Sequence, residues 1–268
     1  MANDNSGDGI IMKNFALIGD GAIAKYHRKA IEHVGGKLSC IYDPDKYPEN
    51  INIHDLTPIV SSIIDIRRYF HPCAQNYCVI CSPSNFHRSQ IQFILKNFPA
   101  TTQIICEKPA FLPWEQPILD DRINIVLQLR YLPNLPESAD KISVRFVRDD
   151  SYFQSWKGNP KKTGGLFYSL FIHYIDLAQR LNADFEGIVQ GSGIQCRKIQ
   201  KAGISDYDIL NINMQGCYNL LYENILNGNG IKPTEISYLA WSLYRNSEIF
   251  GYGKNGINKT INIGHELL

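Results

Sequence analysis

The sequence predicts an α/β protein in which a doubly wound parallel sheet is followed by an α+β domain with a shortened sheet. Up to about residue 127, strand-length runs that are apolar almost throughout alternate with helix-length segments, as in a sheet covered on both faces. After residue 128 polar and apolar residues alternate, which is typical of a sheet with one exposed face. We therefore expect a disordered tail over 1–12, a first domain over 13–127 and a second domain over 128–268.

The elements of the first domain follow from its short apolar runs and the turns between them. The run that begins near Lys13 ends in a Gly-rich turn, and the second run ends at Asp43. Because strands and helices alternate, right-handed crossovers in a parallel sheet are expected. Strands are predicted over 14–18, 37–42, 77–81, 103–106 and 123–127, and helices over 22–33, 55–69 and 84–97.

The second domain has fewer clear elements. The segment Lys141 to Val147 alternates as KISVRFV, and 186–190 is a weaker strand candidate. Helices are predicted over 165–181, over 216–226, where an Asn- and Gly-rich stretch follows, and over 234–250, where Thr234 can cap the first turn.

Composition excludes several classes of protein. The 268 residues carry 27 Lys and Arg against 26 Asp and Glu, so a net charge of +1 gives no general attraction to nucleic acid or to an anionic membrane. No window of about 18 apolar residues is present, and the first residues have no basic or apolar signal region. A cytoplasmic protein without nucleic-acid or membrane partners is expected.

The seven cysteines are an odd number spread through apolar segments, which favours reduced core thiols over a disulfide framework. Cys78 and Cys81 have CxxC spacing. They lie in an extended apolar run, where positions three apart point to opposite faces, and no second pair follows. We expect buried strand packing here and no metal site.

A Gly-rich turn follows the first predicted strand and opens the first helix. Gly19 to Ala24 reads G-x-G-x-x-A, the pattern of a Rossmann dinucleotide-binding turn, in which the diphosphate lies on the helix N-terminus. Asp43 follows Gly21 by 22 residues, at the end of the second strand, where a carboxylate can bind both ribose hydroxyls. No Arg stands beside Asp43, so NAD is favoured over NADP. A turn without a ligand is the alternative. The predicted cofactor-binding residues of this region are Gly19, Gly21, Ala22, Ile23 and Asp43.

Two further loops are expected at the same edge of the sheet. Ser82, Pro83 and His87 follow the third predicted strand, and Glu107 and Lys108 follow the fourth. Ligands of open α/β sheets bind at the carboxyl ends of the strands, so these residues are predicted cofactor contacts. A Glu-Lys-Pro turn is usually a solvated surface turn. Beside an oxidised nicotinamide, desolvation and the cationic ring would lower the pKa of Lys108 toward a value useful for proton transfer.

A Gly-Gly pair precedes the predicted helix over 165–181. Helical spacing places Ser169, His173 and Asp176 on one face. A histidine on an apolar helix is more often a hydrogen-bonded core residue than a catalyst, so spacing alone leaves both roles open.

These segments occur together, in this order, in one known family. The chain resembles the Gfo/Idh/MocA oxidoreductases in its G-x-G-x-x-A turn, its Pro83-x-x-x-His87, its Glu-Lys-Pro and its Gly-Gly helix with His173 and Asp176. The resemblance covers about 12–184 and returns weakly near 218–245. Further similarity to the UDP-N-acetylglucosaminuronate 3-dehydrogenase branch lies in NFALIG (14–19), ICEKP (105–109), LQLR (127–130) and SWKGNPKK (155–162).

The resemblance implies an NAD-dependent dehydrogenase that oxidises a secondary hydroxyl, at C3, of a UDP-N-acetyl amino sugar for surface-polysaccharide synthesis. Lys108 and His173 would be catalytic, one accepting the hydroxyl proton and the other binding the developing carbonyl oxygen. It also implies a homo-oligomer, a dimer or tetramer. The residues expected to bind the substrate are Arg130, Trp156, Lys157, Lys161, Ser169 and His173.

The chain departs from the family pattern at the helix and in the sheet. Ser169 stands where the family has Asp or Asn, and Phe171 replaces a Gly. Several strands of the second domain and the helix after the fifth strand have no counterpart in the sequence. The alternatives are a UDP-N-acetylglucosamine 3-dehydrogenase, another sugar or polyol dehydrogenase, and a non-catalytic regulator that binds NAD or a sugar nucleotide.

Overall fold

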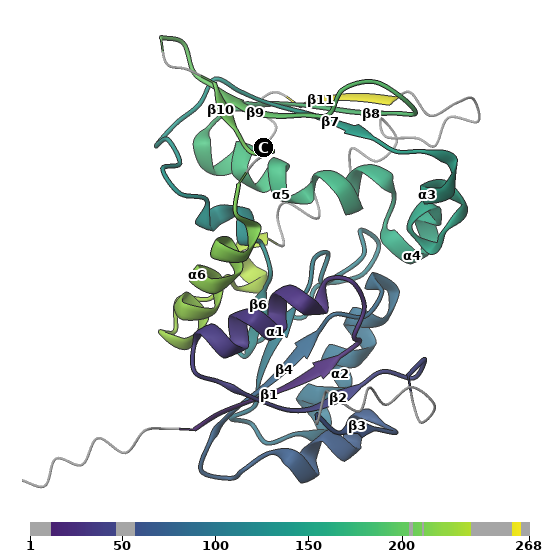
Figure 1. The fold of residues 1–268 in the computed structure, drawn as a ribbon, viewed down its shortest axis with the longest axis vertical. Coiled ribbons are helices and arrows are strands. Elements are labelled where there is room, and N and C mark those ends of the chain that lie inside the picture. The colour runs from purple at the N-terminus through teal and green to yellow at the C-terminus, as the bar shows by residue number, and fades with distance from the viewer. Residues whose placement is uncertain (1–11, 47–56, 204–205, 211, 237–258, 264–268) are drawn as a thin grey trace, which may run out of the picture.

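The computed structural model describes residues 12–46, 57–203, 206–210, 212–236 and 259–263. Two sheets lie at opposite ends of the molecule, and the long helix α5 (Leu166–Leu181) lies between the second sheet and the first domain (Figure 1). The predicted α/β architecture with two sheets is confirmed. The predicted disordered tail lies almost wholly outside the described residues, and the boundary at 127/128 stays a prediction.

The first sheet has six strands in the order β3-β2-β1-β4-β5-β6, and its pairings are all parallel. This order reverses direction beside β1, which places the first turn at the topological switch point of the sheet. The strands are β1 (Lys13–Ile18), β2 (Lys37–Tyr42), β3 (Ile59–Val60), β4 (Gln75–Ile80), β5 (Gln103–Cys106) and β6 (Ile123–Ile125).

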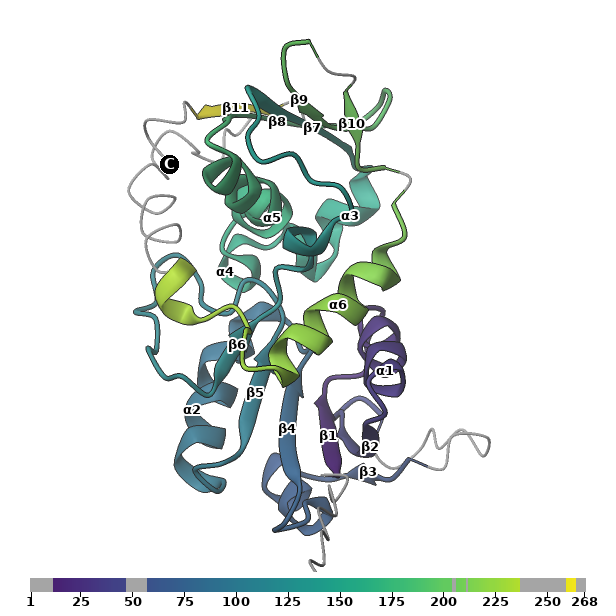
Figure 2. The same ribbon diagram turned by 90° about the vertical axis from the view of Figure 1, so that its left-hand side faces the viewer.

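Helices α1 (Ala24–His33) and α2 (His87–Asn97) lie on opposite sides of this sheet (Figure 2). Each buries residues at helical spacing: Ala24, His27 and Ala30 in α1, and Ile91 and Ile94 in α2. The short 3-10 helix η2 (Ser84–Phe86) leads into α2, so this helical segment matches the predicted one.

The predicted helix over 55–69 is wrong. Within its described part, Ile59–Val60 forms the edge strand β3, paired with Ile41 and Tyr42 of β2, and a 3-10 helix, η1 (Ile63–Tyr69), follows. Two β-branched residues beside an open sheet edge gain more from strand pairing than from a helical turn. The hydroxyls of Ser61 and Ser62 then bind Asp65, which interrupts any single helix through this segment.

The second sheet has five strands in the order β10-β9-β7-β8-β11 within the described residues. Strands β7 (Lys141–Val147) and β8 (Asp184–Gln190) confirm the two predicted ones. Sequence patterns did not predict β9 (Cys196–Gln200), β10 (Tyr207–Asp208) or β11 (Lys259–Ile263). Only Ile199 of β9 is buried, so that strand lacks the apolar alternation that marks a strand in the sequence.

Helix α6 (Met214–Leu226) returns from the second sheet to the first domain and packs along α1 (Figure 2). Tyr218, Leu221 and Tyr222 belong to the same buried core as β1 and β4. The predicted helix over 216–226 is thus confirmed, and its packing joins the two halves of the chain. The predicted helix over 234–250 lies mostly outside the described residues.

Five of the seven cysteines, Cys78 and Cys81 among them, are buried, as expected for core thiols. In the part of the chain that the structure describes, no helix combines the length and apolar character needed to cross a membrane.

Candidate cofactor and active site

Three strand ends and the Gly-rich turn meet at one edge of the first sheet. Gly19 donates its backbone N–H to Tyr42 O at 2.8 Å, and Gly19 has a φ of +90°. A Cβ at Gly19 would lie 2.7 Å from the backbone N of Ser82. Gly19 is therefore required both by its left-handed conformation and by its contact with the loop after β4.

Gly21 differs from Gly19 because the fold does not require it. A Cβ at Gly21 would meet nothing within 4 Å, and the N-cap residue of α1, Ile23, provides no side-chain cap. The turn thus presents open space beside the N-terminus of a helix, where free N–H groups and the helix dipole favour an anion. This arrangement fits the diphosphate of a dinucleotide, with Gly19, Gly21, Ala22 and Ile23 as its predicted contacts.

Asp43 lies beside this turn at the end of β2. Its Oδ2 accepts a hydrogen bond from Asp20 N at 2.8 Å, and its Oδ1 accepts one from Asp45 N at 3.0 Å. Asp20 itself pairs with Arg28 at 3.0 Å and with Lys46 at 2.6 Å. The carboxylate predicted to hold the ribose is therefore fixed against the Gly-rich turn, where a ribose bound to the diphosphate would lie.

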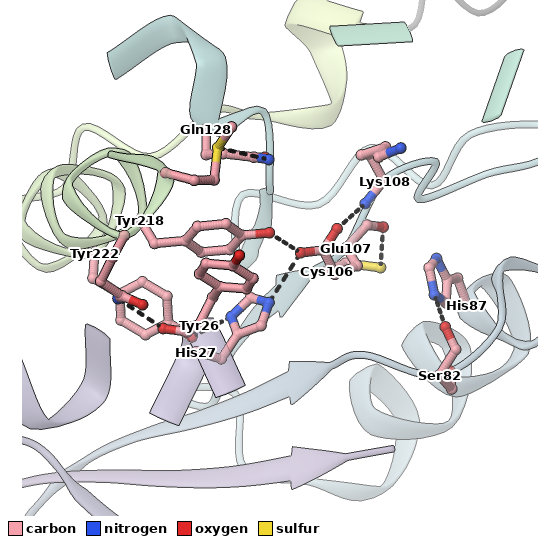
Figure 3. Close-up of polar contacts among 12 residues, drawn as sticks. Tyr26, His27, Ser82, His87, Cys106, Glu107, Lys108, Gln128, Tyr218 and Tyr222 are labelled. Carbon is pink, nitrogen blue, oxygen red and sulfur yellow. Dashed lines mark hydrogen bonds and ion pairs between the residues drawn. The ribbon is translucent and has the colours of Figure 1, made fainter. Parts of the chain in front are cut away.

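His87 connects the loops after β4 and β5. The residue is 1% exposed. Its Nε2 contacts Ser82 O at 2.7 Å (Figure 3), and its Nδ1 contacts Pro109 O at 2.8 Å. Burial lowers the pKa of His87, while the carbonyl contacts act in the opposite direction. His87 holds the two predicted cofactor-binding loops together, and direct contacts of Ser82, Pro83 and His87 with NAD stay predictions.

Glu107 is the centre of a buried polar cluster formed with His27, Tyr218 and Tyr222 (Figure 3). Its Oε1 contacts His27 Nε2 at 3.0 Å and accepts a hydrogen bond from the Tyr218 hydroxyl at 2.7 Å. The other ring nitrogen of His27 contacts the Tyr222 hydroxyl at 2.7 Å. Burial alone would raise the pKa of Glu107, but hydrogen bonding and charge from His27, with the Tyr218 hydroxyl, outweigh it and lower the pKa to about 2. Glu107 is thus an anion held inside the protein.

The partners of Glu107 are not evident from the sequence. The one local indication is His27 on the buried face of α1, at the spacing of Ala24 and Ala30. Nothing local connects this position to Glu107, which is 80 residues away along the chain. The cluster instead ties α1, the end of β5 and α6 together directly beneath Lys108.

Lys108 connects the two domains. Its Nζ donates a hydrogen bond of 2.7 Å to the main-chain oxygen of Ser169, on α5. Burial lowers the pKa of Lys108, and the adjacent Glu107 carboxylate acts in the opposite direction. The structure therefore brings together Lys108 and the helix that carries Ser169 and His173, two groups predicted independently.

His173 lies on α5 one helical turn after Ser169. It is 6% exposed, and its Nδ1 is buried without a hydrogen-bond partner among the described residues. Burial and the charge of Lys108 hold its pKa well below the ordinary value. A neutral imidazole with a buried, unpartnered nitrogen is costly unless a ligand completes it, so His173 fits a group that binds substrate or accepts a proton.

Arg130 has protein partners for its charge. Its guanidinium forms a two-point contact with Asp176 at 2.7 and 2.8 Å and a third contact with Glu235 at 2.8 Å. These carboxylates hold the short 3-10 helix η3 (Gln128–Tyr131), which follows β6, against α5 and the segment after α6. The predicted contact of Arg130 with the substrate remains a prediction, and it would have to compete with both carboxylates.

The remaining predicted substrate residues lie on two short helices that follow α3 (Asp150–Gln154). Trp156 and Lys157 belong to η4 (Trp156–Gly158), and Lys161 belongs to α4 (Pro160–Thr163). Trp156 is 42% exposed, and Lys157 and Lys161 are exposed as well. Lys157 Nζ lies 5.9 Å from the ring centre of Tyr152. These side chains have no fixed charged partner among the described residues and are free to meet a ligand.

Two family models match the chain. Residues 13–117 match the oxidoreductase family, NAD-binding Rossmann fold, and residues 140–188 match the C-terminal alpha/beta domain of the same Gfo/Idh/MocA family. The chain belongs to the Gfo/Idh/MocA oxidoreductase family. NAD is its cofactor, and the Gly-rich turn and Asp43 lie inside the matched NAD-binding region.

Several solved structures share the fold. A WlbA (WbpB) dehydrogenase from Thermus thermophilus in complex with NAD and UDP-GlcNAcA has a TM-score of 0.70 at 23% identity, covering 87% of this chain and 95% of its own. The WlbA dehydrogenase from Bordetella pertussis, with NADH and UDP-GlcNAcA, has a TM-score of 0.65 at 16% identity, covering 95% and 98%. A myo-inositol dehydrogenase from Corynebacterium glutamicum has a TM-score of 0.61 at 14% identity, covering 95% and 99%.

Proposed function

We propose that this member of the family oxidises a secondary hydroxyl, at C3, of a UDP-N-acetyl amino sugar such as UDP-N-acetylglucosaminuronate. The observation that carries the proposal is the meeting of Lys108 with the helix of Ser169 and His173 beside the NAD-binding edge. Both WlbA structures of similar fold were solved with NAD or NADH and UDP-GlcNAcA, and the SWKGNPKK segment lies next to the same helix.

The residues divide the proton chemistry between them. His173 is neutral at pH 7 because of its lowered pKa, so its imidazole can accept the hydroxyl proton. Lys108 Nζ, which in this structure donates to a main-chain oxygen, can donate instead to the developing carbonyl oxygen. NAD held at the Gly19–Gly21 turn and Asp43 would supply the hydride acceptor for the same carbon.

Ser169 replaces the carboxylate or amide of the family pattern, and its role follows from what a hydroxyl can do. A serine can donate to or accept from a sugar hydroxyl, but it cannot carry a negative charge at neutral pH. The proposed mechanism therefore routes no proton through Ser169 and assigns it to orienting the sugar ring.

The proposal is tested by incubating the protein with NAD and UDP-N-acetylglucosaminuronate, UDP-N-acetylglucosamine or myo-inositol, while the absorbance of reduced nicotinamide is followed. Turnover with a UDP-sugar, and a 3-keto product by mass spectrometry and NMR, is the expected result. Turnover of myo-inositol alone would show that the substrate is a polyol and not a UDP-sugar. NAD binding without turnover of any of them would overturn the proposed reaction and favour a regulator.

A further inference from the structure

We propose that Arg148 and Arg197 form an anion-binding subsite beside Ser169, which takes a carboxylate or phosphate group of the substrate. The inference deepens the proposed function and rests on it. Neither arginine belongs to the residues that the family resemblance brings forward.

Both guanidinium groups face one aromatic ring. The Cζ of Arg148 lies 4.8 Å and that of Arg197 lies 5.0 Å from the ring centre of Phe146, in β7. Phe146 supplies cation–π attraction to each, but two like charges gathered at one ring repel each other unless an anion lies with them.

The two arginines have no carboxylate partner in the part of the chain that the structure describes. The Nε of Arg197 is buried with no hydrogen-bond partner there, and its Nη2 has only a long 3.4 Å contact with Gln195. By contrast, Arg28, Arg122 and Arg130, which are also partly buried, each pair with an aspartate. An unpaired, half-buried guanidinium pair is the arrangement expected of an anion site.

The subsite lies on the face of the second sheet that α5 covers. Arg197 lies opposite buried Val144 in the β7–β9 register, so its side chain points to the face covered by α5. On α5, Tyr174 lies close enough to Arg197 for the guanidinium charge to oppose the rise in the Tyr174 pKa that burial causes.

Tyr152 connects the subsite to the reacting centre. Arg148 Cζ lies 5.2 Å from its ring centre. Burial raises the pKa of Tyr152, and Arg148 and Ser169, which lie close to its hydroxyl, act in the opposite direction. Ser169 in turn accepts the hydrogen bond from Lys108 through its main-chain oxygen. If the hydroxyl at the reacting carbon of a sugar binds Lys108, another substituent of the same sugar would thus lie near Tyr152 and Arg148.

Two groups of the proposed substrate have this chemistry: the sugar carboxylate and the diphosphate. The test uses Arg148→Gln and Arg197→Gln. Arg145→Gln is the matched control, because Arg145 is exposed on the face of β7 opposite to Phe146. Calorimetry with the NADH complex measures the Kd for UDP-N-acetylglucosaminuronate, UDP-N-acetylglucosamine and UDP. We expect Arg148→Gln and Arg197→Gln each to weaken binding about tenfold or more, and Arg145→Gln to leave it unchanged.

The ligand series separates the sources of the anion. Weakened binding of the uronate alone assigns the sugar carboxylate, and weakened binding of all three assigns the diphosphate. Wild-type affinities in both Arg148→Gln and Arg197→Gln would overturn the inference while leaving the proposed function intact.

A second probe separates the inference from the function. If the wild type binds no UDP-sugar, thermal stabilisation by pyrophosphate or glucuronate is compared across the same variants. Stabilisation that requires Arg148 and Arg197 keeps the subsite and overturns the substrate assignment, and its absence overturns both.

Discussion

The Nζ of Lys108 donates a 2.7 Å hydrogen bond to the main-chain oxygen of Ser169, so a loop of the NAD-binding domain is joined to the long helix of the second domain at one point. Beneath Lys108, the buried Glu107 anion is held by His27 and Tyr218. The lysine thus has a fixed support on one side and a replaceable partner on the other, which suits a group that must turn from a carbonyl of the protein to an oxygen of a ligand.

The first prediction concerns proton transfer. Lys108→Ala and His173→Ala should each lower kcat by about 100-fold or more, because each removes a group that acts on the reacting oxygen. NAD affinity, measured by calorimetry, should change little. Lys96→Ala, an exposed lysine at the end of α2, is the matched control. Unchanged kcat in both active-site variants would show that neither residue takes part in proton transfer, and that Lys108 only joins the two domains.

The second prediction concerns cofactor choice. Asp43 should bind the ribose hydroxyls of NAD and repel the 2′-phosphate of NADP, so the wild type should favour NAD by about tenfold or more. Asp43→Asn keeps an acceptor for Asp20 N but removes the charge, and should bring the two Kd values closer. Asp45→Asn, which alters an exposed neighbouring carboxylate, should leave the ratio unchanged. Equal affinities in the wild type would remove Asp43 from this role.

Local sequence signals predicted the parts of the site that depend on local geometry. The Gly19–Gly21 turn, the strand ends near Asp43 and Glu107, and the face shared by Ser169 and His173 all follow from spacing within one or two elements. The proton-bearing groups therefore could be proposed before their contacts were known.

Contacts between distant segments could not be predicted in this way. Tyr218 donates its hydrogen bond to Glu107 across 111 residues of sequence. The sequence of α6 indicates which face of the helix is apolar, but not which surface that face covers. Arg148 and Arg197 are brought to one ring by pairing of β7 with β9, and β9 itself has no apolar alternation. Strand pairing and helix docking, which are tertiary events, decide these positions.

The third prediction concerns pH. The folded-state pKa of Glu107, about 2, lies below its ordinary value of 4.5, so the stabilisation by its ionised form is fully present above about pH 4.5 and is lost as the pH falls toward 2. Glu107→Gln should lower the free energy of unfolding by about 1–3 kcal/mol at pH 7. The difference from the wild type should shrink between pH 4.5 and pH 2 in urea titrations. A difference that stays constant over this range would show that Glu107 is not the group that titrates.

The fourth prediction concerns the hydroxyl that supports Glu107. Tyr218→Phe removes one buried, charge-assisted hydrogen bond and keeps the ring, which stacks on Tyr26 at 5.3 Å between centres. The free energy of unfolding should fall by about 1–2 kcal/mol. Tyr69→Phe, at an exposed tyrosine, should change it by less than about 0.5 kcal/mol. Equal effects of the two substitutions in urea titrations would contradict the proposed support.

The last prediction concerns the lysines next to the proposed substrate. Lys157 and Lys161 are exposed on η4 and α4, and they have no ion-pair partner among the described residues. If they meet the diphosphate or carboxylate of a UDP-sugar, the contact exists in both the ground state and the transition state, so its loss should raise KM more than it lowers kcat. The double variant Lys157→Ala/Lys161→Ala should raise KM for the UDP-sugar by about tenfold or more at saturating NAD, since a charged hydrogen bond contributes about 1.5–3 kcal/mol.

Lys162→Ala is the matched control for this pair, because Lys162 is exposed on the same short helix as Lys161 and is not a predicted contact. The KM for NAD should not move in any of these variants, since the cofactor turn at Gly19 lies at the edge of the first sheet, on other elements of the fold. If the double variant and Lys162→Ala give the same KM for the sugar nucleotide, the segment is a solvated surface turn. Substrate charge would then have to be met by other cations, and the variants of Arg148 and Arg197 would show the larger effect.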